Sequence, residues 1–412
     1  MNTINPASPE ALRAAMVDQL AVEGTLVPGH VERAMREVPR HAFVPNASLD
    51  QAYDPDLAVI TKRAQDGAAL SCASVPSVVA MMLQQLDVRP GQRVLEIGAG
   101  TGYNAALLAH LTGDEGRVTT VDIDPEVTDQ AAKALQTTGY GHVHVPTRDG
   151  ALGDEDDAPY DRLILTVGAW DLPPAWWDQL SVGGRLVVPL RWRGQTRSVA
   201  FVREADHLRS EDVELCGFVP MAGQDGEHQG TIDPGGHVTL HWDANQAIDP
   251  ATLSGVLDQP KAEAWSGASV GPYDSFDGVW LRMTATESGT CRIAADPTAV
   301  RTALCTPAIA TRSPALVEGN SLAYFTVRRH EAAEGTERRS ELGATGHGPT
   351  GHELADRLCE QIRAWDHERT AQPAITAHPM GHPRCQTPRR TGHRQDGRPP
   401  RDRFLNRRTL AG

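Results

Sequence analysis

Val94-Leu95-Glu96-Ile97-Gly98-Ala99-Gly100-Thr101-Gly102-Tyr103 is the stretch that decides the fold of this chain. A strand-like run containing one acid leads directly into three glycines at alternate positions, and a helical pattern follows over residues 104–110. Glycine has no Cβ, so these positions let the backbone turn sharply and approach a ligand closely. The spacing is G-x-G-x-G, whereas the dinucleotide fingerprint is G-x-G-x-x-G with a pyrophosphate at the helix N-terminus. The stretch therefore predicts a strand, a ligand-binding turn and a helix in succession.

This glycine spacing, preceded by an acid, is typical of methyltransferases that use S-adenosylmethionine (SAM), a cofactor with no phosphate to bind. The glycines would approach the methionine and ribose parts of the cofactor. The predicted contacts in this turn are Glu96, Gly98, Ala99, Gly100, Thr101 and Gly102.

Helix and strand patterns alternate between about residues 76 and 220. Strands are expected at 93–97, 117–123, 142–146, 161–167, 185–190, 198–203 and 213–219. Helices are expected at 77–86, 105–111, 126–138 and 175–180. This alternation predicts an α/β fold with a doubly wound, Rossmann-like and mostly parallel sheet. Ligands of such sheets bind at the carboxyl ends of the strands.

The length of 412 residues suggests more than one domain. We expect a helical, substrate-side N-terminal segment over 1–75, with a helix at 9–38 and a loop after it, and a SAM-binding domain over 76–224. An accessory α+β domain is expected over 225–370, with strands at 237–242, 279–284, 291–295 and 322–328 and a helix at 351–366. Residues 371–412 form a basic tail that we expect to be disordered.

Composition excludes several classes of function. The net charge of −14 argues against nucleic acid as a partner. No apolar run is long enough to span a membrane, and the N-terminus lacks a secretory pattern. Six scattered cysteines fit a reducing cytoplasm, and the absence of C-x-x-C or H-E-x-x-H spacing predicts no metal.

The basic tail stands apart from this acidic background. Residues 381–412 hold nine Arg and two Asp, a sum of +7, which leaves −21 for the rest of the chain. The tail is either a basic arm that attracts an acidic peptide or the product of a reading-frame change.

Two acids downstream of the glycine turn are candidate cofactor contacts. Asp122 ends a predicted strand, where a carboxylate can accept both ribose hydroxyls of an adenosine group. The alternative is that Asp122 and Asp124 only cap the next helix. Asp149 can accept from the adenine amino group, while Gly150 leaves space for the ring.

At this point the chain resembles the protein-L-isoaspartate O-methyltransferase family. The similar segments, in the family's order, are 38–45, Ala52-Tyr53, Ser74-Val75-Pro76, 94–103, Asp149-Gly150, 158–161 and 183–189. They cover about residues 10–220. The chain departs from the family at Cys72-Ala73, at 166–171 and at Trp176-Trp177, and it has a long C-terminal domain. These departures resemble an actinobacterial branch, the FxLD system, whose members methylate an aspartate in modified ribosomal peptides.

The resemblance implies a carboxyl O-methyltransferase acting on an aspartyl or isoaspartyl residue of a protein or peptide. It places Ser74 beside the substrate, although this serine could instead only cap the helix near Pro76. The acceptor carboxylate has a reference pKa near ~4 and is already ionised at neutral pH, so no general base is needed. The resulting methyl ester would collapse to a succinimide.

Three other hypotheses remain open, of which the first keeps the methyltransferase class and the other two change it. The first is a small-molecule SAM methyltransferase. The second is a nicotinamide oxidoreductase, which would need glycine at position 103, where Tyr103 stands. The third is a non-catalytic protein that recruits a modified peptide. Three arginines could bind a substrate carboxylate, although solvated roles are expected for them: Arg191, Arg193 and Arg197. Three tryptophans could form an aromatic wall for a peptide, although core packing is expected: Trp170, Trp176 and Trp177. His41 and His110 are expected to be structural.

Overall fold

The computed structural model describes residues 8–65, 67–329, 338–371 and 373–380, and these form two compact units. The first unit holds the chain up to Leu190, Thr196–Gln224 and the segment from Ala374. The second holds Arg191–Gln195 and Asp225–Pro373. Within the tail expected to be disordered over 371–412, residues Thr376–Ala377 instead form a strand, β16. From residue 381 on, this expectation lies outside the described residues.

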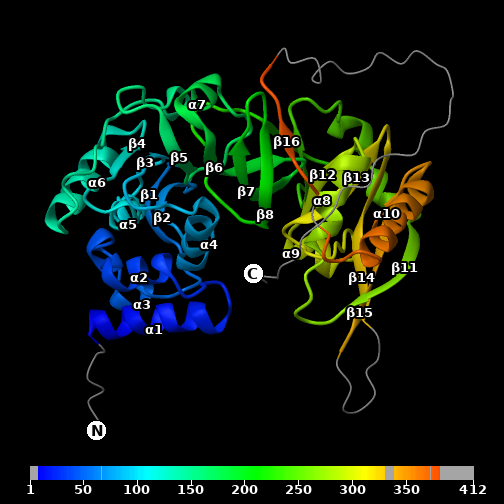
Figure 1. Cartoon of the computed structure of the whole chain (residues 1–412). Coiled ribbons are helices and arrows are strands. Elements are labelled where there is room, and N and C mark those ends of the chain that lie inside the picture. The colour runs from blue at the N-terminus through cyan, green and yellow to red at the C-terminus, as the bar shows by residue number, and fades with distance from the viewer. Residues whose placement is uncertain (1–7, 66, 330–337, 372, 381–412) are drawn as a thin grey trace, which may run out of the picture. The chain divides into compact units, whose positions relative to one another are not determined.

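The first unit is built on a seven-stranded sheet in the order β16-β8-β7-β6-β5-β3-β4 (Figure 1). Its strands are β3 (Arg93–Ile97), β4 (Arg117–Val121), β5 (Tyr160–Leu165), β6 (Leu180–Trp192), β7 (Gln195–Arg203), β8 (Leu208–Leu215) and β16 (Thr376–Ala377). β4, β3, β5 and β6 are parallel, whereas β7, β8 and β16 make antiparallel pairs. The predicted α/β sheet is thus confirmed.

Helices alternate with the parallel strands as expected. They are α4 (Pro76–Leu86), α5 (Tyr103–Thr112), α6 (Pro125–Thr137) and α7 (Pro174–Gln179), with a 3-10 turn at Gly150–Leu152. The strand expected at 142–146 does not form: this segment runs beside β4 and makes only isolated bridges, at Thr119–His144 and Asp122–Thr147. Buried alanines and leucines on α5, with Leu83 and Val94, form part of the core beneath the sheet.

The N-terminal segment differs from the expectation of one long helix over 9–38. Two helices form, α1 (Pro9–Val22) and α2 (His30–Glu37), because Gly24 adopts a left-handed φ of 75° and Pro28 follows. A 3-10 turn at Arg40–Phe43 and the short α3 (Leu49–Ala52) come next. The expected loop contains an antiparallel hairpin, β1 (Val59–Arg63) and β2 (Ala69–Ala73).

The second unit is a seven-stranded antiparallel sheet in the order β11-β15-β14-β13-β12-β10-β9. Its strands are β9 (Glu227–Thr231), β10 (Val238–Asp243), β11 (Ala262–Val270), β12 (Thr290–Ala295), β13 (Ser313–Glu318), β14 (Ser321–Arg329) and β15 (Ser340–His347). Its helices are α8 (Asp277–Thr286), α9 (Pro297–Arg301) and α10 (Gly351–Asp366), with 3-10 turns at Pro250–Leu253 and Val256–Asp258. The strand expected at 279–284 is wrong, because α8 occupies this range. A short buried apolar run does not distinguish strand from helix by periodicity.

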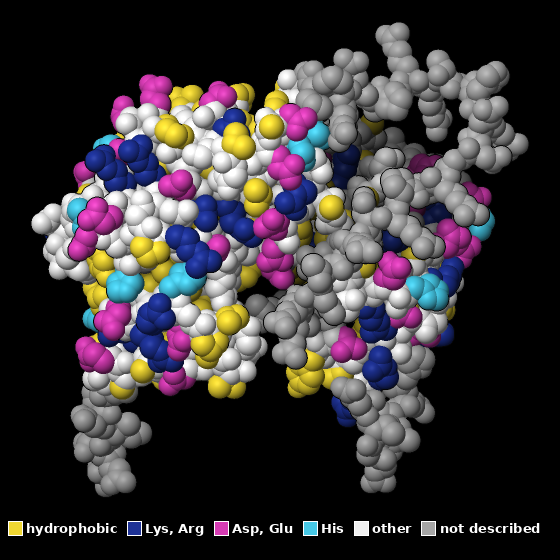
Figure 2. Space-filling view, viewed as in Figure 1, with side chains coloured by type: hydrophobic (Ala, Val, Ile, Leu, Met, Phe, Trp, Pro, Cys, Tyr) yellow, Lys and Arg dark blue, Asp and Glu magenta, His cyan; other side chains and the backbone are white. Residues whose placement is uncertain are grey.

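The surface carries both signs of charge. On the face shown in Figure 2, basic and acidic side chains are interspersed over the described residues. None of the helices in the described parts of the chain is long and apolar enough to cross a membrane.

Candidate functional site

The glycine turn between β3 and α5 has the backbone geometry that its sequence demands. Gly98 and Gly102 adopt left-handed φ values of 101° and 83°. A Cβ at Gly98 would lie 2.5 Å from Thr166 Oγ1, directly after β5, so any other residue would have to displace this side chain. The Gly98 and Ala99 amides donate to the Val121 carbonyl at 2.8 and 3.1 Å. The turn is therefore fixed against the carboxyl end of β4.

A cavity opens beside this turn. Its wall contains Ser74 and most of the predicted glycine-turn residues, together with side chains that were not predicted. The lining residues are Cys72, Ala73, Ser74, Val79, Met82, Glu96, Gly98, Ala99, Gly100, Thr101, Tyr103, Asn104, Ile164, Thr166 and Phe218. Gly102, Asp122, Asp149 and Gly150 lie outside this lining.

The Glu96 carboxyl group is fully buried at the end of β3. It accepts hydrogen bonds from Asn104 Nδ2 at 2.8 Å and from Thr120 Oγ1 at 2.6 Å. Burial nevertheless raises the pKa of Glu96 to about 7, because these two bonds only partly offset the cost of desolvating the charge. Glu96 thus joins β3, β4 and α5 at the wall of the cavity.

Asp122 and Asp124 have different partners. Asp122 Oδ2 accepts from the Gly100 amide at 3.4 Å, which places this carboxylate directly beside the glycine turn. Burial raises the pKa of Asp122. Asp124 caps α6 through the Glu126 amide and forms an ion pair with Lys62 at 2.6 Å. Asp122 is therefore the acid at the turn, and the capping role belongs to Asp124.

Asp149 and Gly150 follow the segment that runs beside β4. Asp149 Oδ1 caps a 3-10 turn by accepting from the Ala151 amide at 2.9 Å. A Cβ at Gly150 would lie 2.4 Å from Ile97 Cγ2, so this glycine allows close packing against the end of β3. Trp176 Nε1 donates to the Gly150 carbonyl at 2.8 Å, which gives this tryptophan a packing role.

Ser74 is held by a residue that the sequence did not single out. Arg40 Nη2 donates to the Ser74 carbonyl at 2.8 Å and to the Ala73 carbonyl at 3.3 Å, and Arg40 Nε donates to the Ala52 carbonyl at 2.9 Å. Arg40 falls in the segment 38–45 that carries the family resemblance, but a single sequence does not reveal that this arginine is buried. The sequence likewise gave no signal for Asn104.

The remaining arginine candidates lie elsewhere. Arg191 forms an ion pair with Glu227 in the second unit at 3.5 Å, and Arg193 lies 3.8 Å from Asp243. Arg197 is buried. None of the three lines the cavity beside the glycine turn, within the residues that the structure describes.

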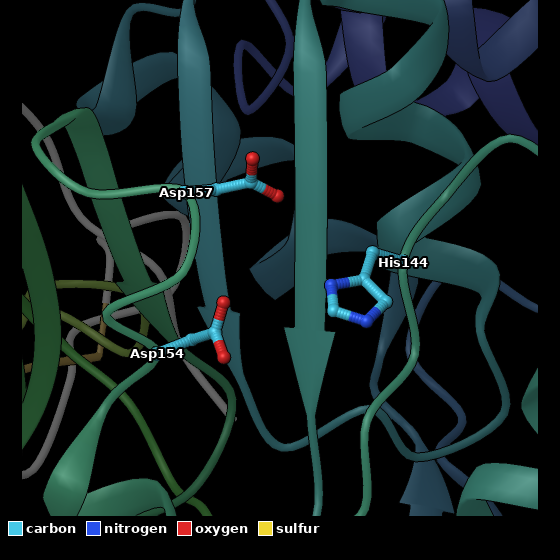
Figure 3. Close-up of side chains that lie close together, drawn as sticks. All are labelled: His144, Asp154 and Asp157. Carbon is cyan, nitrogen blue, oxygen red and sulfur yellow. The ribbon is translucent and has the colours of Figure 1, made fainter.

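One cluster in the first unit has the residue types of a metal site. His144, Asp154 and Asp157 bring ligand atoms within 4.8 Å of one another (Figure 3). Asp154 already forms an ion pair with Arg148, and Asp157 forms one with Arg117 at 3.1 Å. These arginines supply the positive charge that a cation would bring, so we assign no metal to the cluster.

The cavity and its surroundings fit a cofactor such as SAM. A bare backbone at Gly98 and Gly100 lines one wall, and a carboxylate at the end of β4 can accept from two hydroxyls. Within the described residues, the cavity lining contains no Lys or Arg side chain that would neutralise a phosphate.

Comparison with known proteins shows one family over the first unit. Residues 11–226 match the family model described as protein-L-isoaspartate(D-aspartate) O-methyltransferase. A protein-L-isoaspartate O-methyltransferase of Methanopyrus kandleri is 39% identical over 216 residues, which cover 52% of this chain and 92% of the relative. Another, from Rhodopseudomonas palustris, is 39% identical over 219 residues, covering 52% of this chain and 85% of the relative.

Two solved structures are also similar. One, named protein-L-isoaspartate O-methyltransferase, has a TM-score of 0.48 and 20% identity over 86% of this chain and 92% of that one. The other, a Plasmodium falciparum protein with a related name, has a TM-score of 0.46 and 15% identity over 52% of this chain and 99% of that one.

Proposed function

The chain belongs to the protein-L-isoaspartate(D-aspartate) O-methyltransferase family, and from this premise we propose that it methylates an isoaspartyl carboxylate in a protein or peptide. The enzyme is SAM-dependent, as the family is. The observation that supports the proposal best is the cavity that joins the glycine turn to Ser74. It would bring a cofactor and a carboxylate acceptor to one place.

The reaction requires the side chains mainly to position the acceptor carboxylate against the methyl group. Bound SAM supplies an electrophilic methyl group on a sulfonium. The acceptor carboxylate is ionised at neutral pH, so its oxygen needs no base. The residues around the cavity have to hold that oxygen roughly 3–3.5 Å from the methyl carbon and in line with the bond that breaks. Val79, Met82, Ile164 and Phe218 give the cavity an apolar wall that would exclude water.

Each predicted site residue has a proposed role. We propose that Ser74 donates its hydroxyl to the acceptor carboxylate and that Asp122 accepts from the ribose hydroxyls. Asp149 would accept from the adenine amino group, and Gly98 and Gly100 would let the backbone approach the methionine part. After the methyl ester is released, the following backbone amide nitrogen can attack the ester carbonyl carbon and expel methanol, which closes a succinimide without further help.

Paired peptides test the proposed function. Linear and cyclised peptides that differ only in aspartate or isoaspartate are incubated with labelled SAM, and base-labile methyl groups are counted. We expect label on the isoaspartyl peptides. Label on neither peptide of any pair would contradict the proposal.

A matched pair of acids tests the cofactor site. Asp122→Asn should raise the KM for SAM about tenfold, because a charge-assisted hydrogen bond is worth about 1.5–3 kcal/mol. Asp124→Asn removes a carboxylate two residues away that caps α6, and it should change this KM much less. Equal effects of the two variants would reassign the ribose contact.

A second acceptor deserves testing because of the second unit. The family match ends at residue 226, whereas Asp225–Pro373 form a separate compact unit with a sheet and a core of their own. This extra unit favours a dedicated peptide substrate, such as an aspartate in a modified ribosomal peptide. Label confined to the cyclised aspartyl peptides would support this tailoring role over repair.

A further inference from the structure

We propose that Tyr103 and Arg40 form a carboxylate-binding subsite at the wall of the cavity. In this subsite the Tyr103 hydroxyl donates to a carboxylate of the ligand, and the Arg40 guanidinium behind it supplies positive charge. The inference rests on the proposed function, because both SAM and the acceptor carry a carboxylate.

The Arg40 guanidinium is a buried charge without a counter-ion. It has no exposed surface, and no carboxylate of the described residues forms an ion pair with it. Its Nε and Nη2 donate to three backbone carbonyls, but Nη1 is buried and has no hydrogen-bond partner in the described part of the chain. A buried, unpaired charge is costly, so its retention calls for a compensating interaction.

Tyr103 has the second unsatisfied group. Tyr103 is one of the residues that line the cavity, and its buried hydroxyl has no hydrogen-bond partner among the described residues. The Arg40 Cζ atom lies over the Tyr103 ring, 5.1 Å from its centroid, so the guanidinium and the ring are in cation–π contact. Burial raises the pKa of Tyr103 to about 12, and the hydroxyl therefore remains a proton donor at neutral pH.

The position of the pair selects the ligand. Arg40 Nη2 donates to the carbonyls of Ala73 and Ser74, and both residues line the cavity. The positive charge thus lies directly behind the wall that holds Ser74, the serine proposed to donate to the acceptor carboxylate. A phenol donor backed by a guanidinium favours an anion, and a carboxylate is the anion that the reactants bring. It is either the methionine carboxylate of the cofactor or the carboxylate of the acceptor.

Calorimetric titration of the full chain separates these two sources. S-adenosylhomocysteine carries the amino-acid part, whereas 5′-methylthioadenosine lacks it. If the methionine carboxylate is the ligand, Tyr103→Phe weakens S-adenosylhomocysteine about tenfold and leaves 5′-methylthioadenosine unchanged. If the acceptor carboxylate is the ligand, Tyr103→Phe leaves both constants unchanged and raises the KM for the isoaspartyl peptide by a similar factor.

Further variants test the charge. Arg40→Met should weaken binding of the carboxylate ligand, and Arg40→Lys should retain part of that affinity. Thermal unfolding of both variants is followed in parallel. If Arg40→Met does not fold, Tyr103→Phe still carries the test, since it deletes one oxygen atom. Tyr324→Phe removes another buried hydroxyl, in the second unit, and should change none of these constants.

Several results of these measurements would overturn the proposed subsite. The subsite would be overturned if Tyr103→Phe weakened the binding of S-adenosylhomocysteine and of 5′-methylthioadenosine equally. It would also be overturned if neither dissociation constant nor the KM for the isoaspartyl peptide changed. If no peptide is methylated, the proposed function fails, but the comparison of the two nucleosides still reports on the subsite. In that case, dissociation constants that Tyr103→Phe leaves unchanged for both nucleosides would also overturn the subsite.

Discussion

Glu96 is the residue beside the cavity at which burial changes the protonation of a carboxyl group most clearly. It has no exposed surface, and its pKa is raised to about 7 although Asn104 and Thr120 both donate to it. The folded protein therefore retains a proton that the unfolded chain loses at its ordinary pKa of 4.5. The stabilisation is complete below that ordinary pKa and is lost as the pH rises through about 7.

Glu96→Gln should remove this pH dependence. Each unit of pKa shift corresponds to about 1.4 kcal/mol, so the free energy of unfolding of the wild type relative to the variant should fall by about 3 kcal/mol between about pH 4 and pH 8. Urea unfolding of both proteins across this range measures the difference. A difference that stays constant with pH would show that Glu96 does not titrate as described.

Residues around the cavity differ in how visible they are in the sequence. Gly98 and Gly102 could be predicted because their left-handed backbone restricts the residue type. Asp122 could be separated from Asp124 because it ends the apolar run. In the structure it accepts from the Gly100 amide, and its contact with the ribose stays a prediction. Arg40 could not be found, because its burial depends on carbonyls 12 and 34 residues away.

At the scale of elements, the β1–β2 hairpin is the part that was not expected. It leads into Ser74, and the Cys72 carbonyl lies 3.4 Å from the point where a Cβ of Gly100 would stand. Lys62 of β1 forms ion pairs with Asp124 at 2.6 Å and with Glu126 at 2.7 Å, at the start of α6. These bonds tie the hairpin to the helix that follows Asp122.

Lys62→Met should loosen the hairpin without unfolding the protein. Partly exposed ion pairs are worth less than about 1 kcal/mol each, so we expect faster amide exchange over residues 59–73 and little change in global stability. Hydrogen exchange with mass spectrometry measures this, and high salt should reduce the difference from the wild type. Lys133→Met, an exposed lysine on the same α6, serves as the control. Identical amide exchange over residues 59–73 in both variants would contradict the proposed role of the Lys62 ion pairs.

Element boundaries were predicted best where one period dominates. The range of β3 and that of α10 agree with the expectation, since each has a clear pattern and distinct ends. The residues of α8 were expected as a strand because Val279, Trp280, Leu281 and Met283 are all apolar and show no helical stripe. Only the packing of the second unit decides between the two.

The described residues form two compact units, and the chain passes between them more than once. The tip of the β6–β7 hairpin, Arg191–Gln195, belongs to the second unit, and β16 returns to pair with β8 of the first. A fragment that ends at residue 224 would therefore lose an edge strand of the first sheet. Experiments on either unit are better made on the full chain.

Calorimetry of the full chain should show two transitions, of which S-adenosylhomocysteine raises one. A ligand at 100 times its Kd stabilises the unit that binds it by about 2.7 kcal/mol, which corresponds to a shift of a few degrees. Leu107→Ala in the first core and Leu358→Ala in the second assign the transitions, because each deletion of a buried leucine side chain costs about 2–5 kcal/mol. We expect the transition lowered by Leu107→Ala to be the one that the ligand raises. A single transition that responds to both variants and to the ligand would instead make the two units one cooperative structure, and the second unit would then contribute directly to the stability of the cofactor site.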